Sequence, residues 1–447
     1  MMDFEIRGNT KMLRDNRIWI GTSESGPVFL LPQMANRHGL ISGASGTGKT
    51  ICLKVLAEAF SDMGIPVLAT DTKEELSGML KPGIRTDKID KRWEQCGINA
   101  EKVEYKAYPV AFWDAFGQHG HPLRLDIGNV NPLLLARMLE LNEVQTEVLY
   151  NVFRYCQESA FELDDLGDLR DVLRYIVSNI DGFSRLYGKI SPETIGVILR
   201  QLLMVYDRGG NAFFGRPEIS ILDWMRTDNE QRGYINIINS RHISLNYYMY
   251  SSYLVWILTE LNRCLPERGD ADRPAIVLLL DEADMIFKYC SKKMIKLIDS
   301  LLRQMRSKGV GVYMQVLDPL SIPDSINRQL SNRIMLSMNA YTPYDQRNLS
   351  AIAEGLPQNP RLDIADVIKL MKKGEGLVSF LNEAGAPGMT ERVTFLPPQS
   401  QIGPANREEV ARAIAESEIN GKYDAVIDYP TASEKLAFEG NFSIMDF

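Results

Sequence analysis

A glycine-rich stretch followed by lysine and threonine, GASGTGKT at residues 43–50, has the residue types of a phosphate-binding loop. Its spacing satisfies GxxxxGK followed by Ser or Thr, in which the glycines let the backbone wrap a phosphate and turn its N–H groups inward. Lys49 would neutralise the β- and γ-phosphates, and Thr50 would ligate Mg²⁺. The residues predicted to contact the nucleotide are Gly43, Ala44, Ser45, Gly46, Thr47, Gly48, Lys49, Thr50 and Ile51.

Two adjacent carboxylates at the end of an apolar run supply the second half of such a site. Residues 275–280 are all apolar, and Asp281 and Glu282 follow them directly. Asp281 suits the magnesium shell, and Glu282 is placed to polarise the attacking water. This pair is typical of hydrolysing P-loop ATPases with an extra strand between the two motifs, whereas the NKxD string of many GTPases is absent. The predicted cofactors are therefore ATP and Mg²⁺, and the predicted reaction is hydrolysis to ADP and phosphate.

Each motif also has a plainer interpretation. The loop at 43–50 could be a chance run of glycines, and the carboxylates at 281 and 282 could simply be solvated at a strand end. The first alternative is weak because an apolar run precedes the loop and a helical pattern follows it.

The elements around the loop must hold it at the edge of a sheet. HGLIS, at 38–42, reads as a short buried strand, and residues 49–64 carry apolar residues at helical spacing and end on Gly64. IPVLATD, at 65–71, reads as a second strand. Strand, loop, helix and strand in this order form a βαβ unit, which predicts an α/β fold with a mainly parallel sheet and a right-handed crossover.

The pattern along the rest of the chain predicts four segments. The first holds N-terminal strands and half of the core, the second is a mainly helical insertion, the third carries the carboxylate pair and a β-rich extension, and the fourth is a helix and tail. Their predicted bounds are 1–127, 128–264, 265–403 and 404–447.

Composition excludes some classes of partner. The chain has 58 acidic and 50 basic residues, so its net charge of −8 gives no global attraction to nucleic acid or anionic membranes. No apolar run approaches the ~18 residues of a membrane span, and the N-terminus lacks the apolar core of a signal peptide. The five cysteines show no CxxC spacing, which favours a reducing compartment. We expect a cytoplasmic protein without membrane contact.

With both motifs placed, the chain resembles the HerA/FtsK branch of RecA-like ATPases, and most closely the stand-alone bacterial HerA-like, helicase-like proteins of unknown function. The resemblance rests on LLPQMANRHGLISGASGTGKT, DTKEELSG, FFGRPEISILDWMRTD and RQMRSKGVGVYM. It implies a RecA-like core and ATP hydrolysis in a hexameric homo-oligomer, with an arginine of one subunit reaching its neighbour's nucleotide. Arg333 and Arg392 are the candidates for this role and Arg306 is a third, although each could equally be a surface ion-pair residue.

The chain departs from this family at two places. Only about 40 residues precede the loop, too few for the N-terminal barrel that docks a nuclease in related translocases, so a nuclease partner is doubtful. Relatives also end the next strand in a polar γ-phosphate sensor, where this chain has Leu317 and Asp318. Gln315 lies two residues earlier, about 6.6 Å along a strand. We therefore expect weak ATPase activity.

Two functions remain open. The first is a ring ATPase that moves on double-stranded DNA as a translocase or helicase-like motor, for which Lys288, Lys292 and Lys296 form a basic helical stripe that is otherwise simply solvated. The second is a nucleotide-gated assembly or scaffold protein with weak hydrolysis and no translocation. A small-molecule kinase is a weaker third idea.

Overall fold

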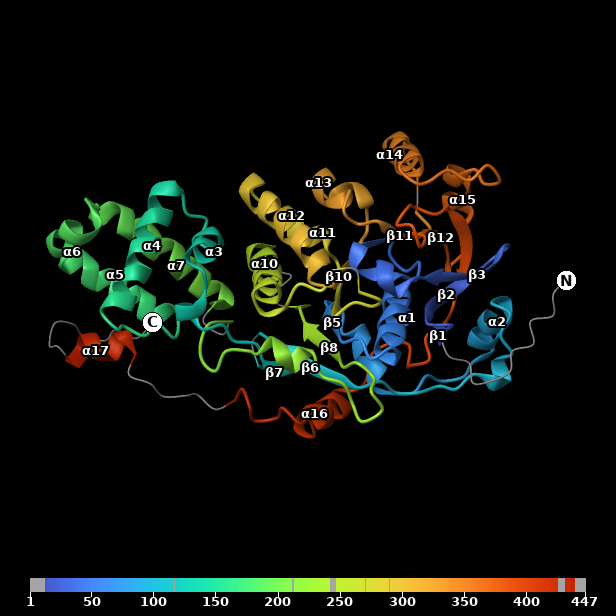
Figure 1. The fold of residues 1–447 in the computed structure, drawn as a ribbon, viewed down its shortest axis with the longest axis horizontal. Helices are drawn as coiled ribbons and strands as arrows, with labels where there is room; N and C mark the ends of the chain where they lie inside the picture. Colours follow the sequence, from blue (N-terminus) through green and yellow to red (C-terminus); the bar gives the residue numbers. More distant parts are fainter. Residues whose placement is uncertain are drawn as a thin grey trace. The chain divides into compact units, whose positions relative to one another are not determined.

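The computed structural model describes residues 13–115, 117–210, 213–241, 247–269, 271–288, 290–338, 340–424 and 431–438. The end of the predicted tail, 439–447, lies outside the described residues. The chain forms two compact units, and Figure 1 shows their elements coloured along the sequence. The first unit takes residues up to 112 together with 221–247 and 257–413, and the second takes 113–220, 248–256 and the residues from 414 onward.

The first unit is built on a mixed sheet. Its strands are β1 (Leu13–Arg14), β2 (Arg17–Ser23), β3 (Gly26–Leu30), β4 (Gly39–Ser42), β5 (Val67–Asp71), β8 (Ile235–Asn239), β9 (Ile276–Leu280), β10 (Val310–Val316), β11 (Asn332–Leu336), β12 (Glu375–Ser379) and β13 (Glu391–Phe395). They run in the order β1-β2-β13-β12-β11-β4-β10-β9-β5-β8, with β3 paired to β2. The strands from β11 to β8 are parallel to one another, while β12, β13 and β2 pair antiparallel. The predicted α/β fold, its mainly parallel sheet and its β-rich extension are confirmed.

The central strands are mostly apolar because both of their faces are covered. Every residue of β4, β5, β9 and β10 is buried, and parallel strands that are covered on both faces read as continuous apolar runs. At the antiparallel side, β13 mixes buried and exposed residues. The extra strand predicted between the loop and the carboxylate pair is β10, which lies between β4 and β9.

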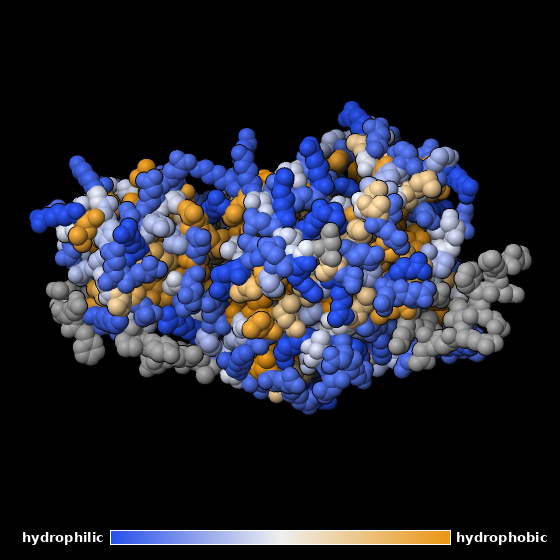
Figure 2. Space-filling view, in the orientation of Figure 1, coloured by the Kyte–Doolittle hydropathy of each residue, from blue (hydrophilic) through white to orange (hydrophobic). Residues whose placement is uncertain are grey.

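Helices of the first unit surround this sheet. They are α1 (Lys49–Asp62), α2 (Asp87–Gln95), α11 (Asp284–Phe287), α12 (Lys292–Ser307), α13 (Asp324–Asn327), α14 (Pro343–Glu354) and α15 (Ile364–Leu370), and most of α16 (Arg407–Ala415). Helices α14 and α15 form a smaller core of their own with Met335 of β11 and Leu377 of β12. On the face that Figure 2 displays, hydrophilic residues protrude and hydrophobic residues mostly lie deeper.

The second unit is mainly helical. Its helices are α3 (Pro132–Met138), α4 (Glu143–Glu158), α5 (Leu166–Ser178), α6 (Ile180–Tyr187), α7 (Pro192–Val205) and α17 (Ala432–Phe438), and its strand is β7 (His121–Pro122). Strand β7 pairs with β6 (Val110–Asp114), which follows β8 in the strand order and has residues in both units. Helix α17 packs on this unit, because the Ser433 amide donates to Asp168 at 3.2 Å and Lys435 Nζ donates to the Ala160 carbonyl at 2.6 Å. The predicted tail therefore docks here over these residues.

The predicted segment 128–264 does not coincide with a compact unit. Its helices α3 to α7 belong to the second unit, whereas β8 belongs to the first because it pairs with β5 in the sheet. Helix α10 (Tyr247–Cys264) contributes residues to both units. No helix in the described parts of the chain is both long and apolar enough to cross a membrane.

Candidate nucleotide-binding site

The phosphate-binding loop connects the buried strand β4 to the first turn of α1. Gly43, Gly46 and Gly48 all have positive φ angles, of 153°, 77° and 116°, a region that favours glycine. A Cβ atom on Gly43 would lie 2.9 Å from Cβ of Leu336 and 3.1 Å from the Thr47 hydroxyl. The loop can therefore take this tight path only with glycine at position 43, as the motif predicts.

Lys49 is buried and folds back over the loop. Its Nζ donates to the carbonyl oxygens of Gly43 and Ala44 at 2.7 and 3.0 Å. Burial lowers the pKa of Lys49, with the nearby charge of Lys73 acting in the same direction and the carboxylates of Asp281, Asp284 and Glu282 opposing it. These charges place the loop lysine close to the carboxylate pair, and an anionic phosphate would compensate its desolvated ammonium group.

Asp281 ends β9 as a buried carboxylate. One oxygen accepts a hydrogen bond from the Thr72 hydroxyl at 2.9 Å, and its backbone N–H donates to the Thr70 hydroxyl at 2.9 Å. Burial raises the pKa of Asp281 above its ordinary value. A bound cation would offset this cost of burying negative charge, so the carboxylate fits a Mg²⁺ ligand, and Thr50 beside Lys49 supplies a second oxygen of the kind that Mg²⁺ prefers.

Glu282 adopts a strained backbone conformation next to Asp281. Its φ angle is 49°, which is uncommon for a residue other than glycine and is often found at functional sites. Its carboxylate forms an ion pair with Lys73 at 2.8 Å, and this hydrogen bond raises the pKa of Lys73. In this structure the predicted general base is thus neutralised by a lysine of its own chain.

Gln315 lies beside Asp281 without any shift of register. Residue 314 of β10 is level with residue 280 of β9, and the Gln315 amide donates a hydrogen bond to Oδ1 of Asp281. The other polar atom of the Gln315 side chain, Oε1, is buried and has no hydrogen-bond partner among the described residues. By contrast, Leu317 is 41% exposed and the Asp318 carboxylate accepts from the Leu320 amide at 2.9 Å, which caps a short turn.

Three residues at the carboxyl end of β5 were missed as site residues. Thr72 contacts Asp281, Lys73 contacts Glu282, and Asp71 shapes the turn by accepting from the backbone N–H groups of Lys73 and Leu76 at 3.2 and 2.8 Å. Burial raises the pKa of Asp71 to about 7. The signal was the position of DTKEELSG after a parallel strand, because the carboxyl ends of such strands meet at one edge of the sheet.

The proposed trans-acting arginines lie on three different elements. Arg333 on β11 donates to the carbonyl and side-chain oxygens of Asn327 at 3.0 and 3.1 Å, and burial lowers its pKa. Arg392 on β13 forms an ion pair with Glu375 at 2.7 Å, and Arg306 is exposed in the last turn of α12. Their role towards a neighbouring subunit stays a prediction.

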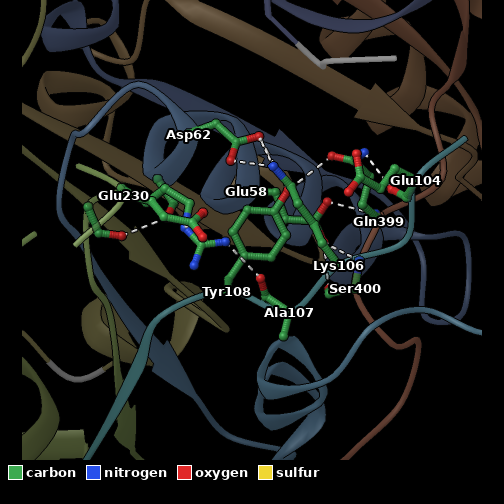
Figure 3. A network of polar contacts seen from close by, with 12 residues as sticks. Glu58, Asp62, Glu104, Lys106, Ala107, Tyr108, Glu230, Gln399 and Ser400 are labelled. Carbon is green, nitrogen blue, oxygen red and sulfur yellow. Dashed lines mark hydrogen bonds and ion pairs between the residues drawn. The ribbon is translucent and has the colours of Figure 1, made fainter. Parts of the chain in front are cut away.

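The far end of α1 is fixed by a network of buried polar groups, which Figure 3 shows. The Glu58 carboxylate accepts hydrogen bonds from the backbone N–H groups of Gln399 and Ser400, at 2.8 and 3.0 Å, and from the Ser400 hydroxyl. Lys54 Nζ donates to the Gln401 carbonyl at 2.6 Å. The helix that begins at the loop is thus tied to the segment 397–405, which follows the last strand.

A mainly parallel sheet with this loop, a carboxylate pair at a strand end and a strand between them define a P-loop ATPase fold. Within this class, the chain belongs to the family described as Helicase HerA-like C-terminal, whose family model matches residues 17–442. A comparison with curated proteins gave no match.

Solved structures share this fold. VirB4 of Thermoanaerobacter pseudethanolicus aligns over 89% of this chain and 99% of its own, with a TM-score of 0.53 and 15% identity. The bacterial conjugative coupling protein TrwB, in an unbound form, aligns over 89% and 92%, with a TM-score of 0.56 and 13% identity. TrwB in complex with ADP and Mg²⁺ covers 84% and 88%, with a TM-score of 0.55 and 13% identity. At these identities the likeness concerns the fold alone.

Proposed function

We propose that this protein binds ATP with Mg²⁺ at the loop 43–50 and hydrolyses it to ADP and phosphate. The observation that carries the proposal is the gathering of Asp281, Glu282 and Gln315 at the carboxyl ends of β9 and β10, where the charges of the two carboxylates also act on Lys49. Structures of TrwB with a non-hydrolysable ATP analogue and with ADP and Mg²⁺ support the choice of ligands.

Each group has a distinct proposed role. Backbone N–H groups of the loop and Lys49 hold the phosphates, while Thr50 and Asp281 hold Mg²⁺, which neutralises charge on the phosphate oxygens. Glu282 accepts a proton from the attacking water. Before it can do so, its carboxylate must leave the ion pair with Lys73.

Gln315 is the proposed sensor of the bound nucleotide. Its amide group contacts the predicted magnesium ligand, and its free Oε1 atom can accept a hydrogen bond once nucleotide, metal or water arrives. Because Gln315 occupies this place in the ordinary register of β10, sensing does not require residues 317 and 318. The expectation of weak hydrolysis rested on those two residues and stays a prediction.

The assembly that we propose is a hexameric ring with one arginine acting in trans, which moves on double-stranded DNA as members of the HerA/FtsK branch do. The second candidate is a nucleotide-gated scaffold with slow hydrolysis. The ion pair that occupies Glu282 favours this slower alternative.

One experiment separates these functions. ATPase rate is measured with and without double-stranded DNA, beside size-exclusion chromatography of the wild type and Glu282→Gln in ATP. Loss of the general base should reduce turnover about 100-fold or more without loss of ATP binding. Stimulation by DNA supports the motor, and nucleotide-dependent assembly without stimulation supports the scaffold. Normal turnover by Glu282→Gln would refute the proposed site.

A further inference from the structure

Arginines gather around a second cavity of the first unit, of about 490 Å³, at the amino ends of the central strands. Arg37 ends a short helical turn (Pro32–Arg37) directly before β4, Arg303 and Arg306 lie near the end of α12, and Arg328 follows α13. We propose that this cavity is an anion site for closely spaced phosphate groups, separate from the loop at 43–50.

The two sites lie at opposite ends of the same strand. The loop leaves the carboxyl end of β4, whereas Arg37 and His38 precede its amino end. A strand of four residues spans about 13 Å. A nucleotide held by Lys49 of the same chain therefore does not account for the arginines.

The walls of the cavity are held in place by buried hydrogen bonds. The His38 ring contacts the Leu302 carbonyl through Nε2 at 2.9 Å and accepts from the Val312 amide through Nδ1 at 3.1 Å. Gln329 donates to the Asp299 carboxylate at 2.6 Å. Burial lowers the pKa of His38 to about 4, and the charge of Arg306 acts in the same direction. His38 is thus a neutral wall residue, and the arginines carry the positive charge.

The charge in this cavity is only partly compensated by the protein. Arg303 forms an ion pair with Asp299 at 2.9 Å, but neither Arg37 nor Arg328 forms an ion pair within the described part of the chain. Guanidinium groups match the paired oxygens of phosphate better than those of any other common anion except carboxylate. Several of them around one cavity favour a ligand with more than one phosphate.

The size and lining of the cavity narrow the ligand further. A volume of about 490 Å³ exceeds what one carboxylate needs and lies in the range of small-molecule sites. The one aromatic ring among the described residues that line it is that of His38, which is 2% exposed and hydrogen-bonded through both nitrogens, so the cavity offers no open ring face on which a base could stack. We therefore infer that the cavity recognises phosphate groups. Either a free polyphosphate compound or the phosphodiester backbone of a nucleic-acid strand can supply them.

Binding is measured in the Lys49→Ala background, so that the loop at 43–50 does not contribute and failure of the proposed ATP site cannot affect the result. The probes are inorganic tripolyphosphate, by calorimetry, and a fluorescent oligothymidylate strand, by anisotropy. Arg37→Gln and Arg328→Gln should each weaken binding about tenfold, the loss expected for one charge-assisted hydrogen bond. Arg361→Gln, which removes an exposed arginine outside the cavity, should change affinity little.

The two probes also identify the source of the phosphate. If a nucleic-acid backbone is the ligand, affinity rises with strand length, and each arginine substitution reduces the slope of log K against log salt by about 0.7. If a free polyphosphate is the ligand, tripolyphosphate binds, and the affinity for the oligothymidylate strand does not rise with strand length. Failure of both probes to bind, or equal affinity in the two cavity variants and Arg361→Gln, would overturn the proposal. Thermal melting of each variant checks its fold.

Discussion

At the scale of single residues, the ion pair of Lys73 with Glu282 restrains the proposed general base. Lys73 is 53% exposed, and a pair of this exposure is worth about 1 kcal/mol or less. We predict that Lys73→Ala raises kcat up to about fivefold, because Glu282 then no longer has to break its ion pair before it activates water. Steady-state ATPase assays check this, with Lys73→Arg as the control that keeps the pair. A fall in kcat would instead assign Lys73 to phosphate binding.

Gln315 gives a second prediction at this scale. Gln315→Ala should lower kcat about 10- to 100-fold while the Kd for ATP changes only a few-fold, because the lost amide contacts Asp281 rather than the loop. Leu317→Ala is the matched control, since it alters an exposed residue at the end of the same strand. An equal fall of kcat in both variants would show that the substitutions act by disturbing the strand end and not by removing the glutamine side chain.

These residues mark the limit of what the sequence could predict about the site. The loop, Asp281 and Glu282 were identified because their chemistry follows from local spacing. The contacts of Gln315 and Lys73 depend on which strands are neighbours and on the register of β10 against β9, a non-local property. Counting from the family motif placed Gln315 too far from the site, although the strand register brings it to Asp281.

At the scale of elements, the helical pattern in the sequence of α1 could not reveal that its polar residues are also buried. Lys54 and Glu58 lie one turn apart and look like a solvated face, yet they are 1% and 0% exposed because the segment 397–405 covers them. That segment comes from more than 300 residues further along the chain, so no local pattern indicates it. The same holds for β8, which the sequence placed within a helical insertion but which completes the parallel sheet.

This buried contact predicts a pH dependence of stability. Burial raises the pKa of Glu58 to about 7, above its ordinary value of 4.5. The folded state therefore binds a proton that the unfolded chain releases, so this stabilisation is complete below pH 4.5 and is lost as pH rises through 7. The loss amounts to about 3 kcal/mol.

Denaturant unfolding of the wild type and Glu58→Gln between pH 4 and 8 tests this prediction. The difference in unfolding free energy between the two proteins should change across this window, while Asp71, whose pKa is also raised, contributes equally to both. Lys54, with a pKa lowered to about 8 by burial, begins to titrate only at the upper end of this window. A difference that is independent of pH would contradict the assignment.

At the scale of the whole molecule, the ring that we propose would complete each site with an arginine from a neighbour. A residue in this role has to be reachable from outside its own subunit. Arg392 meets this requirement, with a side chain that is 42% exposed, whereas Arg333 is largely buried and bonded to Asn327 of its own chain. Among these two we therefore expect Arg392 to act in trans, and Arg333→Ala to act mainly through stability.

Mixing inactive variants tests the ring and the arginine together. Lys49→Ala abolishes nucleotide binding and Arg392→Ala removes the arginine, so neither protein hydrolyses ATP alone. In a randomly mixed ring, about a quarter of the interfaces pair an intact loop with an intact arginine, and activity should return to about that fraction of the wild type. A mixture of Lys49→Ala with Glu282→Gln is the control. Both defects lie on the same side of the interface, so every site lacks either the lysine or the glutamate and no activity should return. No recovery in the mixture of Lys49→Ala with Arg392→Ala would contradict a shared site that uses Arg392. Recovery only when Arg333→Ala replaces Arg392→Ala in this mixture would transfer the role to Arg333.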